Sequence, residues 1–134
     1  MTISVSEQTK VVIVGLGYVG LPLTLAFGEH FSCTGFDINS ARVEAIKGGH
    51  DLHCEVSSEQ IKRSSVTFTT DPKCIRNADL VIVTVPTPIT DDYKPDLSLL
   101  KSASKLIGIE FRNRTVSETP PVVVFESTTY PGCT

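Results

Sequence analysis

The chain has 134 residues, of which 40% are hydrophobic and 20% are charged, and its formal net charge is −3. A chain of this length is expected to form one domain, and its slight negative charge offers no basic surface for nucleic acid. No hydrophobic run approaches the roughly 18 residues of a membrane span, and the first residues lack the pattern of a secretory signal.

The first predicted element is a β-strand at residues 10–14, whose β-branched side chains are typical of a buried parallel strand. A helix is predicted at residues 21–31. Between them lies a Gly-x-Gly-x-x-Gly turn, which consists of Gly15, Leu16, Gly17, Tyr18, Val19 and Gly20.

Each glycine of this turn has its own expected role. Gly15 permits a tight turn, Gly17 lets the backbone approach phosphates, and Gly20 lets the helix pack closely. Free N–H groups and the positive end of the helix dipole then face an anion. The order of strand, turn and helix therefore predicts a binding site for a dinucleotide pyrophosphate.

A second strand, predicted at residues 33–37, ends on Asp37. Asp37 lies at the separation of about 20 residues expected for the acid that binds the adenosine ribose. Its carboxylate would accept hydrogen bonds from both ribose hydroxyls and repel a 2′-phosphate. Because Ile38 and Asn39 follow it, and no arginine does, NAD is favoured over NADP.

A helix is predicted at residues 40–47, with Ser40 as its N-cap and two glycines, Gly48 and Gly49, as its stop. Arg42 lies near the start of this helix. Two interpretations remain open for it: its side chain covers the adenine or ribose, or it is an ordinary solvent-exposed arginine of the helix.

The next segment is polar and irregular, and a cluster of possible metal ligands lies within it: His50, Asp51, His53, Cys54 and Glu55. Their spacing matches no known metal motif, so an ordinary polar loop without a metal is expected.

The four cysteines of the chain show no Cys-x-x-Cys spacing and are expected to be reduced thiols, as in a cytosolic protein. Cys33 and Cys74 are predicted in or near the core, and Cys133 is not expected to act as a nucleophile.

The remaining elements alternate between helix and strand. A helical turn is predicted at residues 59–63, a strand at 66–69, a brief helix at 71–78 that Asp71 caps, and strands at 80–85 and 122–125. Asp96 is the expected N-cap of a helix at 97–110. The alternation predicts an α/β fold, a Rossmann-type doubly wound parallel sheet with helices on both faces.

Hydroxyl side chains follow the last two predicted strands. Thr87 lies between Pro86 and Pro88, which end the strand at 80–85, and residues 126–132 again carry hydroxyls. Ligands of open α/β sheets bind outside the carboxyl ends of the strands. Thr87 is therefore placed to touch the nicotinamide ribose or a phosphate, or else it is a simple turn residue.

Four segments of the chain, at residues 15–22, 35–42, 85–97 and 126–134, together resemble the N-terminal NAD-binding domain of the UDP-glucose/GDP-mannose dehydrogenase family. They look most like the branch that oxidises UDP-N-acetylhexosamines, which includes the Vi-antigen type. The resemblance implies that residues Gly15 to Gly20 hold the pyrophosphate and that Asp37 and Arg42 bind the adenosine side. It also implies that the cofactor cleft is lined by Val85, Pro86, Thr87 and Thr128.

The resemblance further implies a two-step oxidation of the sugar C6 hydroxyl to a carboxylate, with reduction of two NAD. In that family a cysteine thiolate captures the intermediate aldehyde. This catalytic cysteine lies far downstream of the matching segments, so it is expected beyond Thr134, and Cys133 does not correspond to it. Residues 1–134 are therefore expected to be a single NAD-binding domain of a longer dehydrogenase, which binds NAD but does not turn over a UDP-sugar alone.

The full-length enzyme is expected to be a cytoplasmic homo-oligomer, and the truncated domain is expected to expose an apolar patch and to self-associate. Two alternatives remain open at this point. The first is another NAD enzyme, of the hydroxyacid or 6-phosphogluconate type. The second is a non-enzymatic module that senses NAD for a partner.

Overall fold

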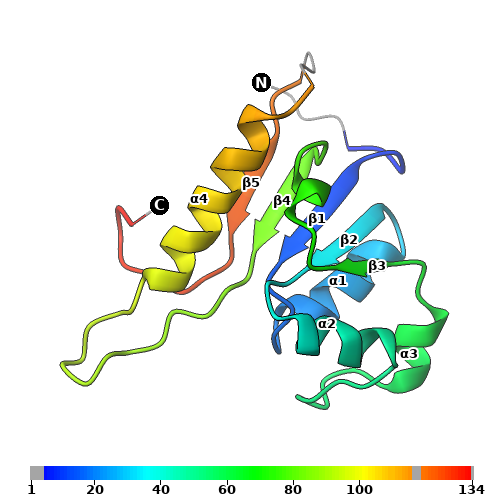
Figure 1. Cartoon of the computed structure of the whole chain (residues 1–134), viewed down its shortest axis with the longest axis horizontal. Helices are drawn as coiled ribbons and strands as arrows, with labels where there is room; N and C mark the ends of the chain where they lie inside the picture. Colours follow the sequence, from blue (N-terminus) through cyan, green and yellow to red (C-terminus); the bar gives the residue numbers. More distant parts are fainter. Residues whose placement is uncertain (1–4, 116–118, 134) are drawn as a thin grey trace.

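The structure is a computed structural model and describes residues 5–115 and 119–133. Figure 1 shows a central sheet with helices packed around it. In chain order the elements are β1 (Lys10–Val14), α1 (Gly20–Gly28), β2 (Ser32–Phe36), α2 (Ser40–Lys47), α3 (Ser58–Arg63), β3 (Thr67–Thr69), the 3-10 helix η1 (Pro72–Ile75), β4 (Leu80–Val83), α4 (Ser98–Arg112) and β5 (Val122–Phe125).

The five strands form one parallel sheet in the order β3-β2-β1-β4-β5. Val12 of β1 is in register with Thr34 of β2 on one side and with Val81 of β4 on the other. The chain thus runs outward from β1 to β3 and then crosses back to place β4 against β1. The carboxyl ends of β1 and β4 form the topological switch point, where ligands of such sheets bind.

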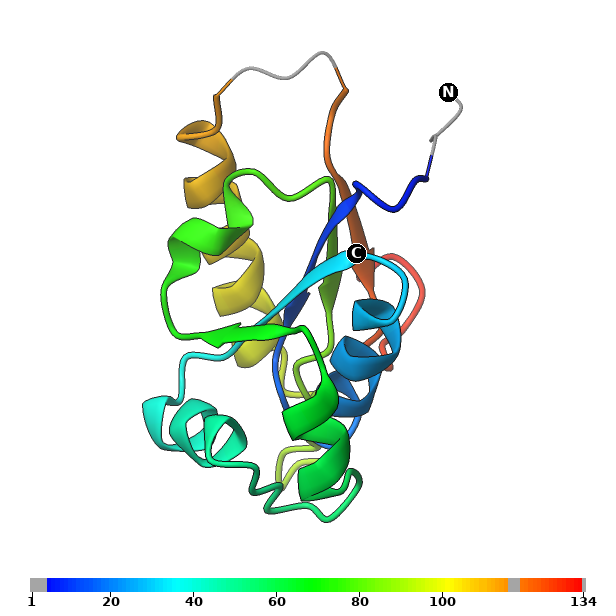
Figure 2. The same cartoon turned by 90° about the vertical axis from the view of Figure 1, so that its right-hand side faces the viewer.

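The side chains of β1 alternate between two hydrophobic layers. Val11 and Ile13 pack on the face that α1 covers, whereas Val12 and Val14 pack on the face that η1 and α4 cover. Figure 2 shows α1 and α4 on opposite sides of the sheet. The predicted doubly wound fold with helices on both faces is therefore confirmed.

Two arginines secure the carboxyl end of α4 to the segment before β4. Glu110 of α4 is buried, and its Oε2 lies 2.6 Å from Nε of Arg76. Arg114 donates to the carbonyl oxygen of Ala78. Because a buried carboxylate is stable only when it is paired, these contacts fix the orientation of α4 against the sheet.

Two predicted elements end earlier in the structure than the sequence indicates. The helix predicted at 21–31 ends at Gly28, where the N–H groups of Glu29 and His30 bond three residues back, to the carbonyl oxygens of Ala26 and Phe27. The strand predicted at 80–85 ends at Val83. Thr84 follows the strand, and its hydroxyl donates to the carbonyl oxygen of Gly15, at 2.7 Å.

Two predicted helix caps are also wrong. Asn39 caps α2 in place of Ser40, and its side chain accepts the N–H of Arg42. Leu97 occupies the N-cap position of α4, although Asp96 still accepts the N–H of Ser98 through its side chain. The predicted cap of η1 by Asp71 is confirmed.

Candidate functional site

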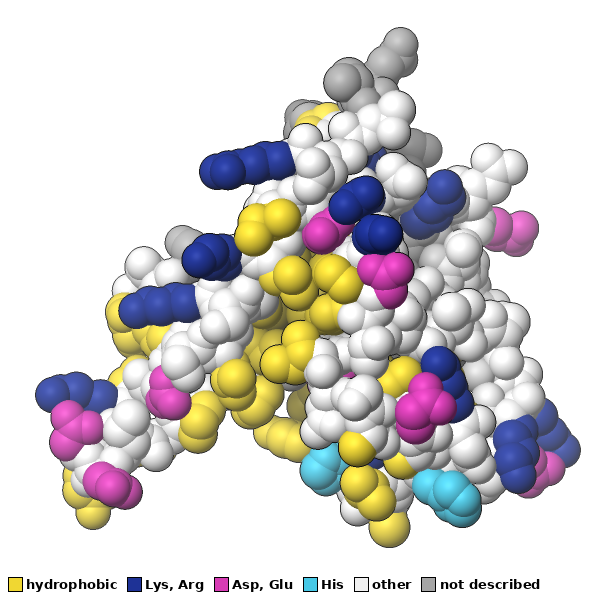
Figure 3. Space-filling model, in the orientation of Figure 1, with side chains coloured by type: hydrophobic (Ala, Val, Ile, Leu, Met, Phe, Trp, Pro, Cys, Tyr) yellow, Lys and Arg dark blue, Asp and Glu magenta, His cyan; other side chains and the backbone are white. Residues whose placement is uncertain are grey.

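A cleft of about 490 Å³ lies at the carboxyl ends of β1, β4 and β5. Figure 3 shows hydrophobic side chains gathered between α4 and the part of the chain that carries α2 and β3. The volume of the cleft is within the range of small-molecule sites. Residues from four separate segments line the cleft: Gly17, Tyr18 and Val19; His53; Thr84, Val85, Pro86, Thr87 and Pro88; and Glu126, Ser127 and Thr128.

A second hollow, of about 740 Å³, lies elsewhere on the molecule. It is lined by residues 5–7 and 28–31, which precede β1 and β2. It therefore lies at the amino ends of these strands, opposite the switch point. None of the predicted site residues lines it.

Two glycines of the turn after β1 are required by the fold itself. Gly15 has a φ of 100°, which side-chain-bearing residues rarely adopt, and a Cβ there would lie 3.2 Å from the backbone nitrogen of Val85. A Cβ on Gly20 would lie 1.7 Å from the carbonyl oxygen of Gly15 and 2.5 Å from the Thr84 hydroxyl. The tight turn and the close packing predicted for these two residues are present.

Gly17 differs from both. A Cβ built on it would meet nothing within 4 Å, and its backbone is not in the left-handed region. The fold therefore gives no reason for a glycine at this position. The space beside Gly17 is open to the cleft, so a ligand can approach the backbone closely.

The amino end of α1, which begins just after Gly17, has no side-chain cap. By contrast, Asn39 caps α2 and Ser57 caps α3. Uncapped N–H groups and the helix dipole attract anions. The turn and the helix together therefore fit the pyrophosphate of a dinucleotide, the group that the sequence predicts there.

Asp37 holds the turn from the carboxyl end of β2. Its Oδ2 accepts the N–H of Leu16 at 2.8 Å, and its Oδ1 accepts the N–H of Asn39 at 2.9 Å. A carboxylate accepts about four hydrogen bonds, so it retains acceptor positions for two ribose hydroxyls. Asp37 is half-buried beside the turn, where the sequence predicts the ribose acid.

Arg42 holds the same peptide from the other side. Its Nε donates to the carbonyl oxygen of Leu16 at 2.8 Å, and its Nη2 lies 2.8 Å from Oδ1 of Asp51. Only 7% of Arg42 is exposed. The interpretation as a solvent-exposed helix arginine is therefore wrong, because a carbonyl and a carboxylate keep the guanidinium inside. Contact with the adenosine stays a prediction.

Asp51 organises the polar loop between α2 and α3. Its carboxylate accepts hydrogen bonds from Arg42 and from the N–H groups of His53, Glu55 and Val56. Burial raises the pKa of the Asp51 carboxyl, but these four bonds together hold it below its ordinary value. Within residues 5–115 and 119–133, no group of three His, Cys, Asp or Glu residues is arranged to hold a metal.

The segments that follow β4 and β5 are joined by two hydroxyl groups. The Thr87 hydroxyl donates to the carbonyl oxygen of Thr128 at 2.8 Å, and the Ser127 hydroxyl donates to that of Val85 at 2.7 Å. Thr87 and Thr128, predicted from separate segments, thus lie together at the cleft. Ser127 lies in the segment 126–132, whose hydroxyls the sequence already places at the carboxyl end of a strand, whereas His53 was not predicted as a cleft residue because it belongs to no motif with a fixed spacing.

The cysteines lie outside the cleft, and all four are free. Cys33 is buried and Cys74 half-buried, and burial raises the pKa of each thiol to about 12. Their predicted place in or near the core is confirmed.

Among the described residues, the helices are too short or too polar to cross a membrane.

The last described residues include Cys133, which is not expected to act as a nucleophile. Cys133 is half-buried against the hydrophobic layer between the sheet and α4, away from the cleft. Thr134, beyond which the catalytic cysteine is expected, lies outside the described residues. The position of that cysteine therefore stays a prediction, and no catalytic residue is assigned within the chain.

Comparison with known proteins gives a consistent result. The sequence pattern of the UDP-glucose/GDP-mannose dehydrogenase family, NAD binding domain, matches residues 9–134. The UDP-N-acetyl-D-glucosamine 6-dehydrogenase of Pseudomonas aeruginosa is 42% identical over 129 residues, and that of Salmonella typhi is 40% identical over 129 residues. Each match covers 96% of this chain but only 29% of the relative.

Solved structures show the same fold. A UDP-glucose dehydrogenase from the archaeon Pyrobaculum islandicum superimposes with a TM-score of 0.83 at 23% sequence identity. The superposition covers 98% of this chain and 32% of that protein. The chain thus spans about three-tenths of the length of the proteins that it matches.

Proposed function

Because the chain belongs to the UDP-glucose/GDP-mannose dehydrogenase family and matches its NAD-binding domain, we propose that it is the cofactor-binding part of a nucleotide-sugar 6-dehydrogenase. The residues of the turn, Gly15 to Gly20, hold the pyrophosphate, and Asp37 binds the adenosine ribose. The nicotinamide side is bordered by Val85, Pro86, Thr87 and Thr128. NAD supplies the hydride acceptor, and the chain's own residues orient it.

The observation that carries this proposal is the open space at Gly17. Glycine is unnecessary there for folding, yet the position adjoins an uncapped helix end at the switch point of the sheet. A phosphate in contact with the backbone explains both features. Asp37 supports NAD over NADP, because its carboxylate would repel a 2′-phosphate.

The proposed substrate of the whole protein is a UDP-N-acetylhexosamine, oxidised at C6 to the uronic acid for polysaccharide biosynthesis. Support comes from two relatives at 40% and 42% identity, both named UDP-N-acetyl-D-glucosamine 6-dehydrogenases. The catalytic cysteine and the sugar-binding half are proposed to lie in sequence beyond Thr134. The whole enzyme is proposed to be a cytoplasmic homo-oligomer.

The hydroxyacid-type alternative has no observation in its favour once the family is assigned. A non-enzymatic NAD sensor would use the same cleft, so binding alone does not separate it from an enzyme. Expression of the chain together with any downstream reading frame decides between the two. Formation of NADH from UDP-N-acetylglucosamine, followed at 340 nm, supports the dehydrogenase.

The test of cofactor binding is a calorimetric titration of the chain with NAD and NADP. We expect saturable binding of NAD and weaker binding of NADP. The Gly17→Ala variant should lose about tenfold or more in NAD affinity, because its methyl group enters the space that the pyrophosphate would occupy. Its thermal unfolding midpoint should not fall, since that methyl group meets no protein atom and the backbone suits alanine.

Gly20→Ala is the matched control. It should lower the unfolding midpoint, because its Cβ would overlap the carbonyl oxygen of Gly15. NAD binding by Gly17→Ala with the affinity of the original chain would contradict the proposed position of the pyrophosphate.

A further inference from the structure

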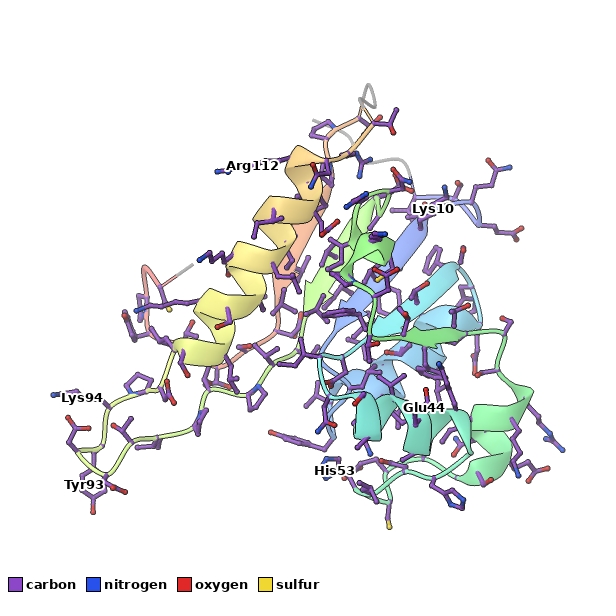
Figure 4. The ribbon with its side chains drawn as sticks, viewed as in Figure 1. Lys10, Glu44, His53, Tyr93, Lys94 and Arg112 are labelled. Atoms are coloured by element: carbon purple, nitrogen blue, oxygen red, sulfur yellow. The ribbon has the colours of Figure 1, made fainter. Side chains whose placement is uncertain are left out.

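His53 lines the same cleft as Gly17, Tyr18 and Val19, although it comes from the loop between α2 and α3. Figure 4 shows His53 below α2, on the side of the loop that faces the segment following β4. The side chain is exposed and is not part of the hydrophobic core. Its place in the lining of this cleft therefore calls for a different explanation.

The charges of the residues that line the cleft suggest a role for His53. Among the described residues that line the cleft, His53 alone has a side chain that can carry a positive charge, and Glu126 carries a negative one. Arg42 is not among the residues that line the cleft, and its Nε and Nη2 are bound to the carbonyl oxygen of Leu16 and to Asp51. A pyrophosphate carries about two negative charges, whereas a helix end contributes only about half a positive charge. A cationic side chain in the cleft would complete the compensation.

The loop is held firmly enough to place His53 there. Oδ1 of Asp51 accepts the backbone N–H of His53 at 3.1 Å and also binds Nη2 of Arg42 at 2.8 Å. Since Nε of Arg42 binds the carbonyl oxygen of Leu16, His53 is linked to the glycine turn by consecutive hydrogen bonds. The next residue, Cys54, has a φ of 55°, a conformation that costs energy for any residue other than glycine.

We propose that His53 binds the pyrophosphate of the dinucleotide, opposite the amino end of α1, and so forms the second wall of the cofactor site. The inference rests on the proposed function, since it assumes that the cleft takes NAD. The imidazole donates an N–H in either protonation state and adds a full charge when protonated. The Arg42–Asp51 pair serves as the support that fixes the distance of this wall from the turn.

The experiment compares His53→Ala with His50→Ala. His50 belongs to the same loop and is also exposed, but it lines a different hollow, with Gly49 and Asp51. Calorimetry measures the affinity of each variant for NAD and for ADP-ribose, which retains the pyrophosphate but lacks nicotinamide. We expect His53→Ala to weaken both ligands about five- to tenfold, and His50→Ala to change neither by more than about twofold.

His53→Lys provides a rescue, because an ammonium group restores the positive charge. It should recover most of the affinity that His53→Ala loses for both ligands. Unchanged affinity in His53→Ala, with the original chain binding NAD, would overturn the inference and leave the proposed function intact. A loss for NAD without a loss for ADP-ribose would place His53 at the nicotinamide end and overturn the pyrophosphate contact. If the original chain bound no NAD at all, the proposed function itself would fail.

Discussion

Leu16 is the residue on which the candidate site depends most directly. Asp37 accepts its N–H and Arg42 donates to its carbonyl oxygen, so the residue that follows β2 and a residue of α2 bind both backbone groups of Leu16. The spacing of the glycine motif predicts Asp37 as a ribose ligand, but the sequence does not reveal its structural bond. Replacing Asp37 by alanine would therefore disturb the turn as well as the ribose contact, which makes Gly17→Ala the cleaner test.

Asp51 is the residue whose protonation should matter for stability. Its pKa lies below the ordinary value, so its contribution is fully present above about pH 4 and is lost as the pH falls through the lowered pKa. We expect Asp51→Asn to lower the free energy of unfolding at pH 7 by about 2 kcal/mol, because Arg42 loses its buried partner. The difference should shrink below about pH 4, as measured by urea unfolding at several pH values.

Asp92→Asn is the control for this prediction. The pKa of Asp92 is also lowered, by hydrogen bonds from Lys94 and Thr90, but its side chain lies on an exposed loop. Its replacement should lower the unfolding free energy at pH 7 far less than Asp51→Asn does, because an exposed ion pair contributes little to stability. A constant deficit in Asp51→Asn from pH 7 to pH 3 would contradict an ionised Asp51 as the source of the stability.

The thiols should differ in reactivity. Burial raises the pKa of Cys33 and Cys74 to about 12, so almost no thiolate is present at pH 8, whereas Cys54 is exposed. We expect a thiol reagent such as Ellman's to modify Cys54 in the folded chain and to spare Cys33 and Cys74. A Cys54→Ser variant should lose one equivalent of fast reaction, and all thiols should react in guanidinium chloride. Rapid modification of Cys33 in the folded chain would contradict its burial.

At the scale of elements, strands were easier to predict than helix ends. β1 and β5 occur where the runs of β-branched residues place them, because a strand that is covered on both faces is hydrophobic throughout its length. Asn39 and Ser40 are both good caps, and the choice between them depends on contacts that the sequence does not show. Asp37 accepts the N–H of Asn39 and so directs the chain into α2 one residue earlier.

β5 is the element most open to other chains. All four of its residues are only partly buried, and within the described residues it pairs with β4 alone. An unpaired hydrophobic edge strand is a site of association between molecules. We expect the chain to self-associate above micromolar concentration, as measured by sedimentation velocity, and Val122→Lys to reduce this association.

Ile38→Lys is the matched control for β5. Ile38 is 75% exposed and lies outside the sheet, so its replacement adds the same charge without affecting the edge. It should leave the association of the chain unchanged. A chain that stays monomeric at about 100 micromolar would contradict the prediction that β5 mediates association between molecules.

At the scale of the whole molecule, the sheet order brings together segments that are far apart in sequence. Thr87 and Thr128 meet because β4 and β5 are parallel neighbours whose carboxyl ends share one edge. That part of the site was predictable, since the alternation of helices and strands already indicates a parallel sheet. The position of His53 was not predictable, because it depends on a buried pair, Arg42 and Asp51, that no local pattern reveals.

The two hydrogen bonds that Asp37 and Arg42 make to Leu16 also affect how fast the cofactor can be exchanged in the proposed reaction. Because both backbone groups of Leu16 are already bound, the turn has its shape before any ligand arrives, and little conformational entropy is lost on binding. Under the proposed two-step oxidation, the turn must release one cofactor and accept another midway through each catalytic cycle. A preformed turn allows this exchange with no slow rearrangement of the turn itself between the two cofactors.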